Sequence, residues 1–170
     1  MNDIKIESQT FKYPLLFRII FRYGNIIITL SLVVYSLPLV VYLDEKKILI
    51  IPLIVTLLII YFLNKHYLNL YKILPYKVDV DDDKITCSGF FLSKKEIIIY
   101  YKDIESLSGG IFENKISGVM KVCDGKNNVC FGFYQRMTNS SKLATIILSK
   151  VKRELYDEVL EKLIAKGKRD

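Results

Sequence analysis

The residues best suited to metal or redox chemistry in this 170-residue chain are three cysteines and a single histidine: Cys87, Cys123, Cys130 and His66. Together they could hold a tetrahedral zinc ion, but closed zinc sites usually bring their ligands in closely spaced pairs, and the chain has no CxxC pair. An odd number of cysteines also disfavours a disulfide framework. We therefore expect no metal site and three free thiols, buried or half-buried, in a reducing compartment.

Other polar patterns offer little to a catalyst. The chain has no P-loop, GxSxG or HExxH motif. The run Asp81, Asp82 and Asp83 could bind a cation, but no calcium-loop spacing follows it, so a solvated hairpin tip is the simpler interpretation. The sequence offers His66 no partner nucleophile in a fixed position. We predict that the protein is not an enzyme and that it has no cofactor.

Two long uncharged segments set the architecture. Residues 23–43 and 48–64 carry no charge, and four residues separate them. A helix rises about 1.5 Å per residue, so the first segment would be roughly 30 Å long, which matches the hydrocarbon core of a bilayer. The first segment starts too far from Met1 for a cleaved signal peptide. The pattern predicts a transmembrane hairpin, within residues 23–73, whose helices cover about 23–43 and 48–64.

The flanks of the hairpin are more basic than its connecting loop. The loop has two lysines, Lys46 and Lys47, next to Asp44 and Glu45. The flanks hold Lys12, Arg18, Arg22, Lys65, Lys72 and Lys77. Because basic residues are retained on the cytoplasmic side, we predict a multi-pass protein with both termini in the cytoplasm.

Residues 1–22 are expected to form a cytoplasmic N-terminal or interfacial segment. Within it, residues 11–22 read FKYPLLFRIIFR, in which three basic residues interrupt a mostly apolar run. Two interpretations are equally compatible with this pattern. The segment is either an amphipathic helix lying in the membrane interface or the first turns of the transmembrane helix.

Residues 74–170 have the pattern of a globular α+β domain. Leu74 and Pro75 end the helical region, and short runs with strand character follow at 76–80, 84–88, 96–101, 104–107, 118–123 and 128–133, with weaker pieces at 90–91 and 111–112. The run EIIIYY at 96–101 is the strongest of these. It has apolar residues on both faces, so we expect one face to be covered by the domain and the other by the membrane or a partner.

The last part of the chain changes period. From Ser141 onward apolar residues recur every four positions, which predicts an amphipathic helix with a break near 153–156. The stripe consists of Leu143, Ile147, Val151, Leu155, Val159 and Leu163. Strands followed by a closing helix predict a β-sandwich covered at one edge or end.

One segment adds a family resemblance. Residues 97–107 read IIIYYKDIESL, and the sequence Tyr101, Lys102, Asp103, Ile104 follows the strongest strand. With the hydrophobic hairpin and the meander of short strands, this resembles the bacterial pleckstrin-homology-like (PH-like) membrane proteins. The resemblance implies an antiparallel β-sandwich or partly open barrel of seven strands with a C-terminal helix, a bacterial cytoplasmic (inner) membrane, and no catalytic residues. The chain departs from the family in its longer C-terminal helical region.

Charge narrows the choice of partners. Residues 76–141 hold nine basic and nine acidic residues, so the strand region is neutral, and the net charge of +7 resides near the membrane and in the last helix. A neutral sheet disfavours a nucleic-acid partner. The candidate membrane-surface or partner contacts are Lys65, Lys72, Leu155, Val159, Lys162, Leu163, Lys166, Lys168 and Arg169.

Two functional classes remain. The first is a non-catalytic membrane-anchored module that binds or scaffolds a protein partner or anionic lipid at the inner face of the membrane. The alternative is an accessory or immunity-type subunit of a larger membrane complex. In either case we expect the bilayer as one partner and a protein, or another copy of the chain, as a second.

Overall fold

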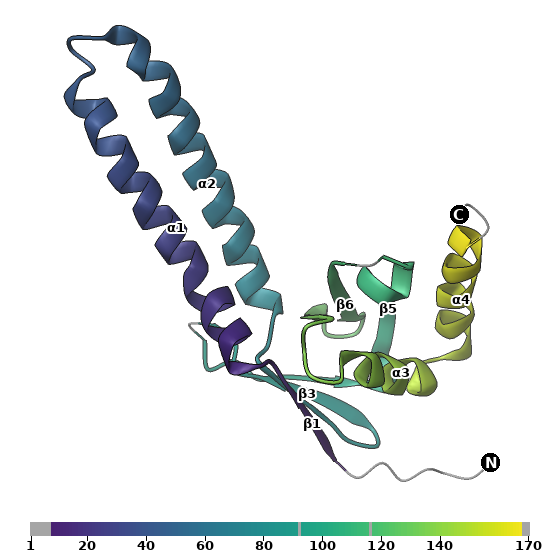
Figure 1. The fold of residues 1–170 in the computed structure, drawn as a ribbon. Coiled ribbons are helices and arrows are strands. Elements are labelled where there is room, and N and C mark those ends of the chain that lie inside the picture. Colours follow the sequence, from purple (N-terminus) through teal and green to yellow (C-terminus); the bar gives the residue numbers. More distant parts are fainter. Residues whose placement is uncertain (1–7, 92, 116, 168–170) are drawn as a thin grey trace. The chain divides into compact units, whose positions relative to one another are not determined.

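The computed structural model describes residues 8–91, 93–115 and 117–167, the last three by their backbone alone. The chain divides into two compact units (Figure 1). One is a helical hairpin of residues 15–72, called the hairpin below. The other combines the segment that precedes the hairpin with everything from Ile73 onward, and is called the β-domain.

The hairpin consists of α1 (Leu15–Val41), a 3-10 turn (Lys47–Leu49) and α2 (Ile50–Ile73). Both helices are long and apolar enough to cross a membrane, and only 6% of each apolar window is buried. The prediction of two long apolar helices is confirmed. Each helix extends beyond the uncharged segment, α1 at its start and α2 at its end.

The segment before the hairpin is a strand rather than the start of a helix. Strand β1 (Gln9–Lys12) pairs antiparallel with β2 (Lys77–Val80), and Phe11 lies opposite Val78. Phe11 is only 3% exposed, so its burial in the β-domain keeps this segment out of α1. The expected helix over 11–22 begins only at Leu15, and the hairpin is thus inserted between two neighbouring strands of one sheet.

The described strands form two antiparallel sheets. Sheet A has the order β1-β2-β3-β4, with β3 at Lys84–Ser88 and β4 at Ile97–Tyr100. Sheet B has the order β5-β6-β7, with β5 at Ile104–Ser108, β6 at Val119–Asp124 and β7 at Val129–Tyr134. The predicted α+β class is confirmed, and the two sheets do not join into a closed barrel. The expected strand piece at 111–112 is instead a 3-10 turn (Gly110–Glu113), and a second such turn, Tyr101–Asp103, links the two sheets.

The core lies between the inward faces of these elements. On β4 the side chains of Ile97 and Ile99 are buried, whereas Ile98 and Tyr100 are 44% and 43% exposed. One face of this strand is therefore covered by the domain itself, and the expectation that the membrane or a partner covers the other face stays a prediction. The largest side chains with almost no exposure include Phe112, Phe131, Phe133, Ile85, Ile99, Ile104, Met120, Leu143 and Ile147.

The C-terminal region consists of two helices, α3 (Ser140–Lys150) and α4 (Arg153–Gly167). The break falls at Val151, whose backbone is extended, slightly earlier than expected. Helix α4 packs against β5 and the Gly110–Glu113 turn. Leu155 and Val159 on this side of α4 are 8% and 1% exposed.

Candidate functional site

The two ends of sheet A differ in how their lysines are paired. At one end β1 finishes and β2 begins, because Lys12 pairs with Lys77 and Lys77 with Ser88. Both chain connections to the hairpin leave from this end, which we call the tethered end; it comprises Lys12, Lys77 and the described residues of the β3–β4 loop, 89–91 and 93–96. The other end, here the far end, carries the β2–β3 turn at residues 81–83 and the last residue of β4, Tyr100.

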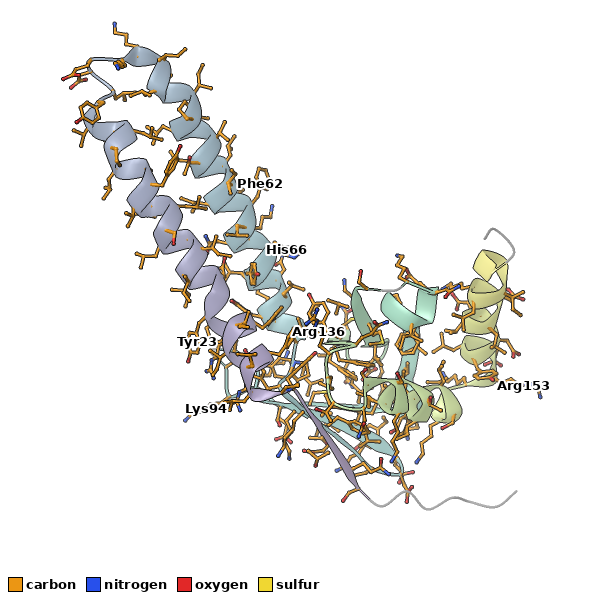
Figure 2. The ribbon with its side chains drawn as sticks, in the orientation of Figure 1. Tyr23, Phe62, His66, Lys94, Arg136 and Arg153 are labelled. Carbon is orange, nitrogen blue, oxygen red and sulfur yellow. A yellow bond between two sulfur atoms is a disulfide. The ribbon has the colours of Figure 1, made fainter. Side chains whose placement is uncertain are left out.

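The tethered end is basic. Lys12, Lys94 and Lys95 are exposed, and Lys94 extends away from the ribbon (Figure 2). Lys77 forms an ion pair with Asp79 at 2.5 Å. Neither Lys94 nor Lys95 has an ion pair with a described residue. Unpaired ammonium groups on a protruding loop can bind phosphate oxygens as charge-assisted hydrogen-bond donors.

The loop that presents these lysines is held at its base. Phe90 is 5% exposed and anchors the start of the loop in the core. The backbone N–H of Lys95 donates to Ser93 Oγ at 3.1 Å, which shapes the turn near its tip. The base of the loop that carries Lys94 and Lys95 is therefore fixed by its contacts with the core.

The connections to the hairpin are also fixed. Tyr13 accepts a hydrogen bond at its hydroxyl from the backbone N–H of Tyr134 (2.8 Å), and the N–H of Thr138 donates to the Lys12 carbonyl (3.0 Å). Tyr13 and Tyr76 make an edge-on ring contact with centroids 6.5 Å apart. Burial raises the pKa of Tyr13 well above its ordinary range, although the bond from Tyr134 opposes the shift. The β-domain thus holds both of the segments that connect it to the hairpin.

The far end holds three aspartates, but Lys84, Lys102 and Lys150 lie beside them, so their charge is balanced. Lys150 Nζ donates to the backbone carbonyl of Asp82 at 2.6 Å and contacts its carboxylate at 3.2 Å. The same ammonium lies 5.3 Å from the ring centroid of Tyr101, whose hydroxyl donates to the Asp81 carbonyl (3.4 Å). Burial, then the charges of Asp81 and Asp82, raise the pKa of Tyr101. The three aspartates form the turn between strands β2 and β3, as predicted, and Lys150 links that turn to α3.

The structure divides the predicted contact residues into groups. Lys65 and Lys72 are exposed on α2 of the hairpin. Lys162 is ion-paired with Glu158 at 2.7 Å, and Leu163 is half-buried. Lys168 and Arg169, and the side chain of Lys166, lie outside the described residues.

Two of the predicted contacts require correction. Leu155 and Val159 were expected on a docking face, but they are buried against β5 and the Gly110–Glu113 turn. The four-residue period identified an apolar stripe but not which of two adjacent stripes faces the core. The exposed apolar residues of α4 are Tyr156, Leu160 and Ile164, each one position further along than a residue of the predicted stripe.

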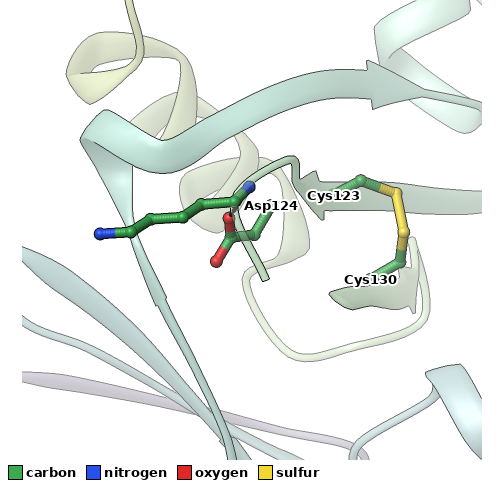
Figure 3. The surroundings of a disulfide bond; sticks show 4 residues. Cys123, Asp124 and Cys130 are labelled. Atoms are coloured by element: carbon green, nitrogen blue, oxygen red, sulfur yellow. Dashed lines mark hydrogen bonds between the residues drawn. A yellow bond between two sulfur atoms is a disulfide. The ribbon is translucent and has the colours of Figure 1, made fainter. Parts of the chain in front are cut away.

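The cysteine prediction was also wrong. Cys123 and Cys130 form a disulfide between β6 and β7 (Figure 3). Cys87 is free and buried. Cys123 and Cys130 lie opposite each other in the register of β6 and β7, with Cα atoms 4.1 Å apart. The predicted strands 118–123 and 128–133 leave a turn at residues 124–127, which would not set the two cysteines opposite each other. In the structure Asp124 pairs with Val129, and this register places Cys123 opposite Cys130. Burial, followed by the charge of Asp79, raises the pKa of the Cys87 thiol and makes it unreactive.

The hairpin has a polar cluster of its own. Asn25 Nδ2 donates to Asn64 Oδ1 at 3.0 Å, and Asn64 Nδ2 donates to Thr29 Oγ1 at 3.1 Å. Asn25 is only 5% exposed. Hydrogen bonds of this kind hold apolar helices in register where burial of apolar surface gives no preference.

Comparison with known proteins adds no further constraint, because no family model, no curated protein and no solved structure matches the chain. The two ends of sheet A are the feature on which a function can be argued. The tethered end offers an anion-binding surface because its exposed lysines have no ion pair with a described residue, whereas at the far end Lys150 is already bound to Asp82.

Proposed function

We propose that the protein is a non-catalytic, membrane-anchored PH-like module whose β-domain binds anionic lipid head groups at the inner face of a bacterial cytoplasmic membrane. The carrying observation is that Lys12, Lys94 and Lys95, which have no ion pair with a described residue, lie at the tethered end, where both connections to the hairpin leave sheet A. Glu96 is the one acidic residue of the β3–β4 loop. Lysines placed in this way would draw the tethered end towards an anionic surface.

The short connections support this orientation. Two residues separate β1 from α1, and three separate α2 from β2. Fully extended, such segments cover only about 7 and 10 Å. If the hairpin spans the bilayer, the tethered end stays close to the head groups without any further contact.

The expected electrostatic gain is moderate. A cation near an anionic leaflet contributes roughly 1 kcal/mol. Lys12, Lys94 and Lys95 are available for this, while Lys77 already pairs with Asp79. The tether supplies the high local concentration, so a weak attraction is enough to orient the domain.

The strand arrangement supports the PH-like assignment. Four antiparallel strands in one sheet, three in a second and a C-terminal helical region correspond to what the resemblance implies. The chain departs from that plan in two places. The hairpin enters between β1 and β2, and the C-terminal region has two helices rather than one.

Two observations bear on the side of the membrane. The excess of basic residues on the hairpin flanks favours the cytoplasm, whereas a disulfide is typical of oxidising compartments. We give more weight to the flanks, since the disulfide joins cysteines that the β6–β7 register already holds together. A reporter fused after Asp170 and one inserted between Glu45 and Lys46 should therefore lie in the cytoplasm and outside it, respectively.

The lipid contact can be tested on the full chain in nanodiscs. Lysine acylation is measured by mass spectrometry in discs of phosphatidylcholine and in discs that also contain phosphatidylglycerol. We expect Lys94 and Lys95 to react more slowly in the anionic discs, and high salt to remove the difference because it screens the attraction. Equal rates in both discs would contradict the proposal.

A matched pair of variants separates local contact from net charge. Lys94→Glu/Lys95→Glu reverses two charges at the tethered end, and Lys102→Glu/Lys126→Glu reverses two exposed charges near the far end. Protection of Lys12 by anionic lipid should be lost in the first variant only. Loss in both would indicate a nonspecific effect of net charge.

A protein partner remains the second candidate. It is favoured by the exposed apolar residues of α4, which a purely lipid-binding role leaves without a function. An accessory or immunity-type subunit of a larger membrane complex would use such a surface.

A further inference from the structure

Helix α4 has a second apolar stripe that faces away from the core. Tyr156, Leu160 and Ile164 are spaced four residues apart and are 39%, 36% and 60% exposed. Residues at this spacing share one face of a helix. The adjacent stripe, with Leu155 and Val159, is the one that packs on the domain.

The stripe continues into a hollow at the junction of α3 and α4. The residues that line it are Thr145, Leu148, Ser149, Val151, Arg153 and Tyr156. Tyr156 belongs to both the hollow and the stripe. Together they form one surface from the end of α3 along α4, which we call the α4 face; it is apolar along the stripe and of mixed polarity in the hollow.

One edge of the α4 face is acidic. Asp157 and Glu161 each follow a stripe residue, so at about 100° per residue they border it on the side away from the core. Both carboxylates are exposed, as is that of Glu154. Among the described residues, the one cation paired with these carboxylates is Arg153, which reaches Asp157 only at 3.9 Å and is 91% exposed. Its side chain extends outward from α4 (Figure 2). Glu161 and Glu154 have no ion pair with any described residue.

We propose that the α4 face docks an amphipathic helix of another protein, with apolar residues on its contact face and Lys or Arg along one edge. The apolar stripe supplies contact area for helix-on-helix binding, and the acidic edge selects a basic partner. A second copy of this chain fits less well, because antiparallel packing of two α4 helices would set acidic edge against acidic edge. An anionic bilayer is disfavoured by the same charge.

The test uses two synthetic peptides with the full chain in phosphatidylcholine nanodiscs. Both peptides have the same helical design with leucines on one face; one has lysines at the edges and the other has glutamates. Binding is followed by fluorescence anisotropy, with empty nanodiscs as the blank. We expect the lysine peptide to bind about tenfold more tightly than the glutamate peptide, from two or three charge contacts.

Variants then locate the contact. Leu160→Asp should weaken the lysine peptide by at least about tenfold, since it places a charge in the centre of the stripe. Ile98→Asp, at an exposed apolar residue of sheet A, is the matched control and should change nothing. Asp157→Lys/Glu161→Lys should reverse the preference and favour the glutamate peptide.

Several outcomes would overturn the proposal. These are equal binding of both peptides, no binding above the blank, binding that survives Leu160→Asp, and a charge-reversed variant with unchanged preference. Self-association of the full chain that Leu160→Asp abolishes would assign the face to a second copy instead. None of these outcomes depends on the lipid-binding proposal, because the discs carry no anionic lipid.

Discussion

The hairpin and the β-domain differ in which side chains they bury. In the hairpin the apolar side chains point outward and the buried side chains include Asn25 and Thr56. In the β-domain aromatic and aliphatic side chains are buried and the outer surfaces are mostly polar. The hairpin therefore depends on an apolar surrounding and uses polar contacts for register, whereas the β-domain carries its own core.

The largest expected effect concerns the place where the two regions meet in sequence. A fragment of residues 74–170 lacks β1 and the buried Phe11 and Tyr13. Loss of a buried Phe side chain alone costs about 3–5 kcal/mol, a large part of the 5–15 kcal/mol that stabilises a typical domain. We expect this fragment to give no cooperative thermal transition by circular dichroism.

The same fragment joined to residues 8–13 by a short Gly/Ser linker should fold cooperatively, because β1 can again pair with β2. This chain is the control for the first. Two equally stable fragments would show that β1 is dispensable and that the β-domain begins at Leu74.

A second prediction compares two leucines on one helix. Leu155 is 8% exposed and Leu160 is 36% exposed, and both lie in α4. Leu155→Ala should lower the free energy of unfolding by about 2–5 kcal/mol. Leu160→Ala should change it by no more than about 0.5 kcal/mol. Chemical denaturation of the joined fragment measures both, and similar losses would mean that the α4 face is part of the core.

The third prediction is a pH dependence confined to the β-domain. Asp124 is 1% exposed and accepts hydrogen bonds from the N–H groups of Lys126 (2.8 Å) and Asn127 (3.2 Å) and from Asn127 Nδ2 (2.7 Å). Burial, the largest single influence, would raise its pKa, but the hydrogen bonds from Asn127 and Lys126 together lower it. The folded state thus holds the ionised carboxylate more favourably than the unfolded chain does.

The direction of the pH dependence follows from this difference in the pKa of Asp124 between the folded and the unfolded state. The stabilisation is fully present above the unfolded pKa of about 3.9 and is lost as pH falls through the lower folded pKa. Asp124→Asn should cost about 1–3 kcal/mol at neutral pH and flatten the acid limb of the stability curve. An acid limb identical to that of the wild type would argue against the role of Asp124.

The smallest effect is expected in the hairpin. Asn64→Ala removes the side-chain bonds to Asn25 and Thr29, and each such bond between membrane helices contributes about 0.6 kcal/mol. Ser36→Ala is the control, since Ser36 bonds only to a carbonyl of its own helix. Unfolding in mixed micelles, followed by energy transfer between the helices, should show a small loss for Asn64 and less for Ser36.

The two regions also differed in how far the sequence could predict them. The hairpin follows from local composition, because two uncharged runs and a four-residue loop leave few alternatives. Most strands of the β-domain were also found, from β-branched runs and turn residues. Strand β1 was missed because its four residues gain their structure from partners more than sixty positions away.

The candidate site was predicted only in part. The sequence placed the basic excess near the membrane and in the last helix, but Lys94 and Lys95 lie in a segment with balanced charge. Their significance depends on the register that sets the β3–β4 loop beside the two connections. The mistaken assignment of Leu155 and Val159 had a similar cause, since a helix with two adjacent apolar stripes does not reveal which one faces the core.

The central claim is that the tethered end of sheet A faces anionic lipid. The most direct test is paramagnetic broadening of backbone amide signals by head-group-labelled lipid, with the full chain in nanodiscs with and without phosphatidylglycerol. We predict stronger broadening at residues 93–96 than at residues 81–83, and a further increase at 93–96 when the anionic lipid is present. Equal broadening at both ends, or stronger broadening at 81–83, would contradict the account.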